Sequence, residues 1–154
     1  MSNWPPVEIE ESIMGSPEAL VDECYRMISF AAGSLPAWDR FKSLFVEKAI
    51  LILRVFPGDE SISVMNLDQY TNQQIREGMK EEGYTETPIK QEWFGFGDVL
   101  ETRVIFTMQF GEKDPITAFD IFQLVKLEGR WWITSITGEI PKPGVEVPKD
   151  LLTK

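Results

Sequence analysis

Asp120 is the residue of this sequence with the clearest capacity for chemistry, because it is an acid inside an apolar strand pattern. It stands in the segment Asp120-Ile-Phe-Gln-Leu, where alternation places Phe122 and Leu124 on the same face of the strand. An ionised carboxylate among such neighbours is costly, so it must find partners or shift its pKa upward. Two roles are open. Asp120 binds a polar group of a ligand, or it ties the sheet to a helix.

The side chains expected beside Asp120 are hydroxyls and aromatic rings. Tyr25 lies on the apolar face of a predicted helix, where it is either a ligand contact or core. The two-residue turn Glu128-Gly129 pairs Asp120 with Thr137 and Phe122 with Ser135. The facing of this last strand stays open, because a one-residue shift of the hairpin would exchange Ser135 and Thr137 with Thr134 and Ile136. The candidate ligand-binding residues are Tyr25, Asp120, Trp93, Phe122, Ser135 and Thr137.

A second acid–base pair, Glu101 and Arg103, lies two residues apart on one predicted strand. Alternation places both side chains on the face away from the core. A cross-strand ion pair between Arg103 and Glu92, worth about 0.2–1 kcal/mol, explains their presence without any ligand.

Several kinds of site are disfavoured by the residues that the sequence lacks. It has no histidine, which is the commonest general base and metal ligand. Its single cysteine, Cys24, excludes an internal disulfide and a cysteine-based zinc cluster. No calcium-loop motif is present either. The sequence therefore predicts neither a metal nor a cofactor.

Charge and hydropathy narrow the range of partners. The 154 residues include 15 Lys+Arg and 25 Asp+Glu, a net charge of −10, and the bases are scattered. Nucleic acid and anionic membrane surfaces need clustered bases, so neither is an expected partner. The longest apolar run is Ala49 to Leu53, and the residues from Met1 to Pro6 do not resemble a signal peptide. We expect a cytoplasmic protein.

The first half of the chain predicts mainly helices. Residues 1–15 read as an extended lead-in, and Ser16 and Pro17 are typical of a helix start. Gly33 marks the expected end of that helix. Further helices are expected at 36–45 and 68–82, and strands at 49–56 and 61–65.

The second half predicts a meander of four long strands, at 84–96, 99–110, 116–127 and 130–140. Residues 141–154 form a proline-containing tail. We predict a single α+β domain over 16–140, in which three N-terminal helices pack in a strongly curved, mostly antiparallel mixed sheet.

The outer face of this sheet is also substantially apolar. It is expected to carry Phe119, Ile121, Val125, Trp132 and Ile136. One small domain has helices for a single face only, so we expect a second subunit to cover the other. The sequence thus predicts a homodimer through the outer face of the sheet.

Three segments resemble the nuclear transport factor 2-like superfamily, and most closely its SnoaL-like bacterial branch. They are Trp38-Asp-Arg-Phe-Lys-Ser-Leu-Phe45, Phe96-Gly-Asp-Val99 and Leu127-Glu-Gly-Arg-Trp-Trp-Ile133. The resemblance covers about residues 16–140. It implies a cone-shaped fold with a pocket between the long helix and the concave sheet, and it does not imply one function.

The resemblance carries over only part of a known catalytic set. Ketosteroid isomerases of this superfamily hold an oxyanion with a tyrosine and a protonated aspartate, and Tyr25 and Asp120 fall near those positions. The aspartate that serves those enzymes as the base does not carry over, since the matching stretch, Ile52-Leu-Arg54, contains no carboxylate. Two hypotheses remain. The protein binds a small, largely apolar molecule, as an isomerase, cyclase or hydrolase would, or it is a non-catalytic dimeric association module with a filled cone.

Overall fold

The computed structural model describes residues 3–152, which form one sheet of six strands together with five helices. Residues 1, 2, 153 and 154 of the predicted lead-in and tail lie outside this range. The helices are α1 (Glu11–Met14), α2 (Pro17–Ile28), α3 (Trp38–Lys42), α4 (Leu67–Gln73) and α5 (Met79–Glu82). The strands are β1 (Phe45–Leu53), β2 (Ser63–Met65), β3 (Tyr84–Phe96), β4 (Val99–Phe110), β5 (Ile116–Leu127) and β6 (Arg130–Glu139).

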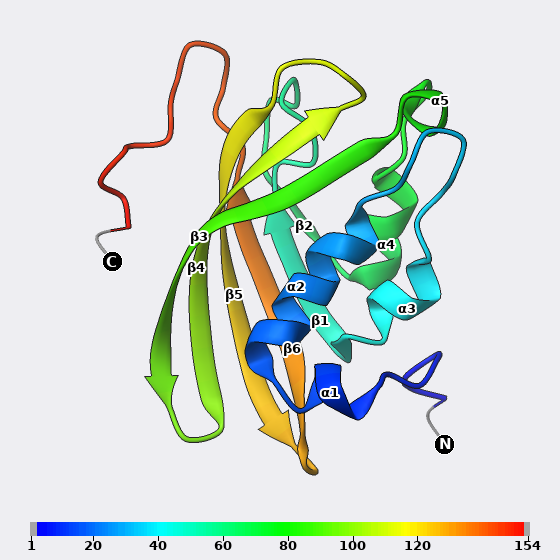
Figure 1. Ribbon diagram of the computed structural model, residues 1–154, viewed down its shortest axis with the longest axis vertical. Coiled ribbons are helices and arrows are strands. Elements are labelled where there is room, and N and C mark those ends of the chain that lie inside the picture. The colour runs from blue at the N-terminus through cyan, green and yellow to red at the C-terminus, as the bar shows by residue number, and fades with distance from the viewer. Residues whose placement is uncertain (1–2, 153–154) are drawn as a thin grey trace.

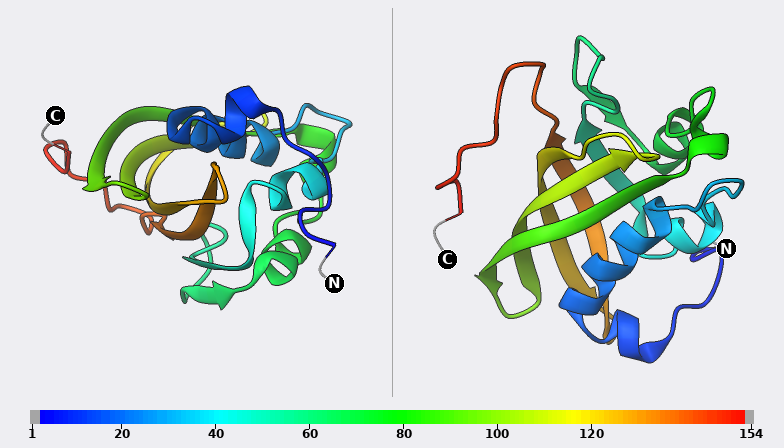
Figure 2. Two further views of the ribbon diagram at one scale, coloured as in Figure 1. Left: turned by 90° about the horizontal axis from the view of Figure 1, so that it is seen from below. Right: turned by 45° about the horizontal axis from the view of Figure 1, so that its top comes forward.

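The sheet has the order β2-β1-β6-β5-β4-β3, with β1 and β6 parallel and every other pair antiparallel. It curls strongly, and α2 lies across the open side of the curl (Figures 1 and 2). This confirms the predicted α+β architecture of helices packed in a curved, mostly antiparallel mixed sheet.

Helix α2 begins where the sequence predicts and ends earlier. The Ser16 hydroxyl accepts a hydrogen bond from the Ala19 backbone N–H at 3.2 Å, which caps the helix. The predicted end at Gly33 is wrong, because the chain leaves the helix after Ile28. There the backbone of Phe30 pairs with Tyr84 of β3 through two hydrogen bonds, of 2.8 and 3.0 Å. Pairing with the sheet thus outweighs extension of the helix.

Other predicted boundaries also shift. The lead-in contains the short helix α1, and the predicted helix at 36–45 ends at Lys42 because Phe45 already pairs with β6. The predicted helix at 68–82 is two helices, α4 and α5. Gly78 separates them with a φ of 88°, a conformation that glycine adopts without strain.

The β3–β4 hairpin keeps its predicted register near the turn. Gly97 has the positive φ that the turn requires, and the pairs from Phe96–Val99 to Gln91–Val104 are those expected. Beyond them a bulge at Ile89 shifts the pairing by one residue, so Pro88 rather than Ile89 lies opposite Phe106. The predicted Ile89–Phe106 pair is wrong.

A second bulge, at Thr134, shifts the β5–β6 pairing in the same way. As a result Ile136 and Gly138 are buried on the inner face, whereas Ser135 and Thr137 face outward. The predictions that Ser135 and Thr137 face the core and that Ile136 faces outward are therefore wrong. One extra residue in a strand exchanges its two faces.

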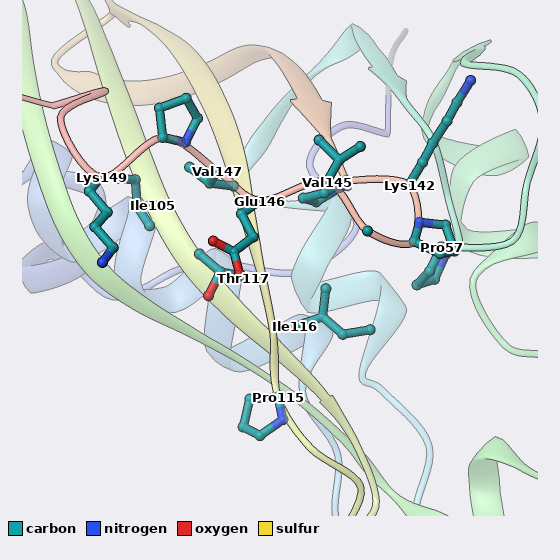
Figure 3. Close-up of a pocket in the computed structure, with 14 residues that line it drawn as sticks. Pro57, Ile105, Pro115, Ile116, Thr117, Lys142, Val145, Glu146, Val147 and Lys149 are labelled. Atoms are coloured by element: carbon teal, nitrogen blue, oxygen red, sulfur yellow. The ribbon is translucent and has the colours of Figure 1, made fainter.

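The outer face carries the ion pairs predicted for it. The Arg103 Nε lies 2.9 Å from Glu101 Oε2, and Arg103 Nη1 lies 3.8 Å from Glu92 Oε1. Part of this face is covered by the tail after β6, because the Lys90 Nζ donates a hydrogen bond to the Leu152 carbonyl and the Leu152 side chain is buried. A cleft of about 710 Å³ separates the tail from the sheet beside Ile105 (Figure 3).

Within residues 3–152 no helix is long and apolar enough to cross a membrane. The cytoplasmic location stays a prediction.

Candidate functional site

A small cavity of about 30 Å³ lies between α2, α4 and the inner face of the sheet. Its volume suits a group the size of a water molecule. Its wall combines apolar side chains with acids, an amide, a phenol and a guanidinium group. The lining residues are Ile28, Leu53, Arg54, Val55, Tyr70, Gln74, Glu86, Phe106, Met108, Asp120, Ile136, Gly138, Glu139 and Ile140.

Tyr25 and Asp120, which the sequence singles out, meet beside this cavity. The Tyr25 hydroxyl donates a hydrogen bond of 2.9 Å to Asp120 Oδ2, and both residues are buried. The Tyr25 ring packs against Phe106 and Phe122, with ring centroids 5.4 and 5.5 Å apart. The long helix and the central strand β5 thus hold the Tyr25–Asp120 pair rigidly.

Asp120 fits into the core because the residue across from it on β6 is a glycine. The bulge at Thr134 places Gly138 opposite Asp120. A Cβ atom at position 138 would lie 2.2 Å from Asp120 Oδ1, well inside any allowed contact. Only a glycine at position 138 therefore leaves room for the Asp120 carboxyl group.

Glu86 is a second acid of the same cavity, and the sequence analysis did not identify it. The bulge at Ile89 turns Glu86 and Tyr84 inward, and the Tyr84 hydroxyl donates a hydrogen bond to the Glu86 carboxyl group. The available signal was Pro88, since a proline within a strand often marks a bulge or an edge. Strict alternation would place Glu86 outside.

Burial raises the pKa of both acids. It raises the pKa of Glu86 to about 7, against a small opposing effect of the hydrogen bond from Tyr84. Burial, and then the charge of Glu86, raise the pKa of Asp120 well above its ordinary value, although the Tyr25 hydrogen bond acts the other way. Near neutral pH Glu86 is therefore close to its midpoint, and burial favours the neutral form of Asp120.

Gln74 is the third polar group in the wall. It follows directly after α4, which an Asn66–Gln69 capping box fixes at its start. The residue is 3% exposed, and no residue between 3 and 152 donates a hydrogen bond to its Oε1. A buried polar atom without a partner costs about 1–3 kcal/mol, so a group in the cavity is expected to satisfy it.

The cavity meets solvent beside an ion pair. The Arg54 Nε lies 3.1 Å from Glu139 Oε1, and Arg54 also donates a 2.7 Å hydrogen bond to the Asp59 carbonyl. Among the described lining residues, Glu139 alone is exposed, with 51% of its side chain accessible. A molecule larger than the cavity would extend past Glu139.

The remaining predicted site residues lie elsewhere. Trp93 is partly buried against the core and does not line the cavity. The Ser135 hydroxyl donates a 3.1 Å hydrogen bond to Gln123 on the outer face, and Thr137 is exposed there. Phe122 is fully buried behind Tyr25 as a support for its ring.

The chemistry open to this site is hydrogen bonding and proton transfer. Glu86, with a pKa of about 7, can both give and take a proton near neutral pH. The Tyr25–Asp120 pair can hold a polar group in a fixed position. No group of three or more His, Cys, Asp or Glu side chains within the described range is placed to hold a metal ion.

Comparison by sequence gives no match, either to a protein family or to a curated protein. Comparison by structure finds several proteins of the same fold. A nuclear transport factor 2-like protein with a cystatin-like fold from Novosphingobium aromaticivorans superposes with a TM-score of 0.60 at 10% identity, over 82% of this chain and 79% of that one.

Two further structures show how differently proteins of this shape are described. A putative calcium/calmodulin-dependent protein kinase II association domain from Xanthomonas campestris has a TM-score of 0.59 at 16% identity, over 83% of this chain and 86% of that one. A putative scytalone dehydratase from Novosphingobium aromaticivorans has a TM-score of 0.59 at 11% identity, over 85% and 86%. The fold alone assigns no function. This chain therefore has the cystatin-like fold of these proteins, as its resemblance to the nuclear transport factor 2-like superfamily predicts.

Proposed function

We propose that the protein binds a small organic molecule through Asp120, Glu86 and Gln74. The observation that carries this proposal is the buried Gln74 Oε1, which has no partner among residues 3–152 and belongs to a cavity already lined by two acids. Small-molecule sites place a few polar groups in an otherwise apolar wall, and three such groups line this cavity.

The energetic cost of these groups also supports a ligand-binding role. Burying Glu86 and Asp120 makes ionisation of both unfavourable, and an apolar core would avoid that cost. Strongly shifted acids in a cavity are more frequent at functional sites than elsewhere. A reaction at this site would be a proton transfer through Glu86, which is the chemistry of an isomerase.

Native mass spectrometry tests this proposal. The purified protein is weighed intact, then denatured, and the released small molecules are identified. Gln74→Leu removes the unpaired amide, and Gln73→Leu changes the exposed neighbouring glutamine as a matched control. We expect an organic molecule from the parent and from Gln73→Leu, and much less from Gln74→Leu. Release of nothing from any of the three, or of equal amounts from all three, would contradict the proposal.

A second candidate function is a dimeric association module, and one surface favours it. A patch of apolar side chains lies on the outer face at the β3–β4 turn, where Phe94, Phe96 and Val99 are 70%, 92% and 62% exposed. We call these residues, with Val125 and Leu127, the hairpin patch. Exposed apolar patches are frequent at protein interfaces. Phe41, Tyr70 and Phe106 fill much of the cone, which also suits this alternative.

The predicted homodimer through the outer face becomes part of this second proposal. Analytical ultracentrifugation of the parent and of a Phe94→Ser/Phe96→Ser variant tests it, since both rings belong to the hairpin patch. We expect a dimer that the double variant converts to a monomer. A parent that stays monomeric over the whole concentration range would contradict it.

A further inference from the structure

We propose that the group bound in the cavity is a cationic amine, an ammonium head on a small organic molecule. This inference rests on the proposed ligand-binding function and names the chemical class of the ligand. It follows from the donors, acceptors, charges and rings that surround the cavity.

One hydrogen-bond acceptor in the cavity wall, Gln74 Oε1, has no donor among the described residues. The carboxyl groups of Asp120 and Glu86 each accept a hydrogen bond from a tyrosine hydroxyl, Tyr25 and Tyr84 respectively. The Gln74 residue is 3% exposed to solvent, and its Oε1 receives no hydrogen bond from the described residues. An ammonium group supplies three donors and no acceptor, so it matches this wall. A neutral carbonyl oxygen would leave Gln74 unpaired.

The one positive charge among the described lining residues is paired with Glu139 and not with either acid in the cavity. Arg54 is the one basic side chain among the described lining residues, and its hydrogen bonds go to Glu139 and to the Asp59 carbonyl. Neither buried acid therefore has a cationic partner in the described part of the chain. A bound cation would favour ionisation of Glu86 and so release a proton.

The apolar part of the wall is suited to the same group. Tyr70 and Phe106 line the cavity, and aromatic faces attract alkylammonium ions. Where the cavity meets solvent Glu139 is paired with Arg54, but the chain as a whole carries a net charge of −10. A negative surface raises the local concentration of cations.

The pH dependence of binding follows from the groups that face Glu86. Tyr84 on β3, Tyr25 and Cys24 on α2 and Tyr70 on α4 all have pKa values raised well above their ordinary values by burial. Burial therefore favours the neutral form of each of them, and of Asp120 on β5. The Arg54–Glu139 ion pair lies where the cavity meets solvent. Glu86 is left as the group that loses its proton when the amine binds. The affinity should rise about tenfold per pH unit from pH 5 to 7 and then level off.

The test uses methylammonium chloride as the probe, with methanol as a neutral probe of similar size and sodium chloride to match ionic strength. Nuclear magnetic resonance titrations at several pH values follow the backbone amides of Tyr70 and Gly138, which line the cavity and are present in every variant. We expect saturable shifts with methylammonium, absent with sodium chloride and weak with methanol, and the tenfold rise per pH unit. Glu86→Gln should abolish the pH dependence, and Gln74→Met should weaken binding about ten- to a hundred-fold. Glu92→Gln, a change on the outer face of the same strand, should leave both unchanged.

Several results would overturn the inference. One is methanol binding as tightly as methylammonium, and another is methylammonium binding without pH dependence. The absence of any saturable shift with methylammonium is a third. If a neutral molecule then occupies the site in native mass spectrometry, the amine assignment fails and the ligand-binding function stands. If the protein is also empty in that experiment, both fail.

Discussion

Glu86 should make the protein less stable as the pH rises from about 4.5 to 7, and Glu86→Gln should remove that loss. The pKa of this carboxyl group rises from 4.5 in the unfolded chain to about 7 in the folded protein, because the half-buried side chain is desolvated in the cavity wall. Between these pH values the folded protein keeps a proton that the unfolded chain has lost. The free energy of unfolding therefore falls with increasing pH.

The size of the effect follows from the same pKa values. At about 1.4 kcal/mol per pKa unit, the contribution of Glu86 amounts to about 3 kcal/mol at pH 7 and above. Asp120 adds a decrease of the same sign in both proteins, and in the variant it lacks only the part that the charge of Glu86 causes. The difference between the two proteins should therefore grow in favour of Glu86→Gln across this window and stay constant above it.

Urea unfolding at a series of pH values measures this difference, with the slope of each transition checked for two-state behaviour. Glu92→Gln is the matched control, because Glu92 lies on the outer face of the same strand with Arg103 3.8 Å away. The control should follow the parent. Equal pH slopes for the parent and Glu86→Gln would refute the assignment of Glu86 as a buried acid with a raised pKa.

Three other predictions concern the packing around the site. Gly138→Ala places a Cβ atom 2.2 Å from Asp120 Oδ1 and should lower the free energy of unfolding in urea by about 1–3 kcal/mol. The control Gly58→Ala, where the added Cβ meets open space, should change that free energy by less than about 0.5 kcal/mol. Equal effects of the two substitutions would contradict the packing account. Tyr25→Phe removes the 2.9 Å hydrogen bond to Asp120 and should cost about 1–3 kcal/mol by the same assay, and a neutral result would mean that the bond is not formed. Leu152→Ala should release the tail, so that trypsin cleaves it faster while global unfolding changes little; unchanged cleavage would contradict the docking of Leu152.

The sequence predicts the architecture well because alternation and turn glycines are local signals. The two long hairpins, the glycine turns and the inward direction of Asp120 all follow from period-two patterns. The contact between Tyr25 and Asp120 could be predicted from the sequence, because each residue lies on the apolar face of its own helix or strand. Local patterns therefore identify half of the polar cluster.

The other half depends on two bulges that period-two patterns do not reveal. Beyond Ile89 and Thr134 every side chain changes face, which brings Glu86 inward and sends Ser135 and Thr137 outward. Bulges form where the curvature of the whole sheet requires extra twist, and that curvature depends on strands far away in the sequence. Gln74 was missed for a related reason. It follows the last turn of a short helix, and its burial depends on how α4 packs on β1.

A high-resolution crystal structure of protein purified without denaturation tests the central claim most directly, namely that the cavity beside Gln74 holds a ligand. We predict electron density for an organic molecule that extends past Glu139, with a donor atom about 3 Å from Gln74 Oε1 and in contact with Glu86. Density that fits water alone, or a protein side chain that pairs with Gln74, would contradict the claim.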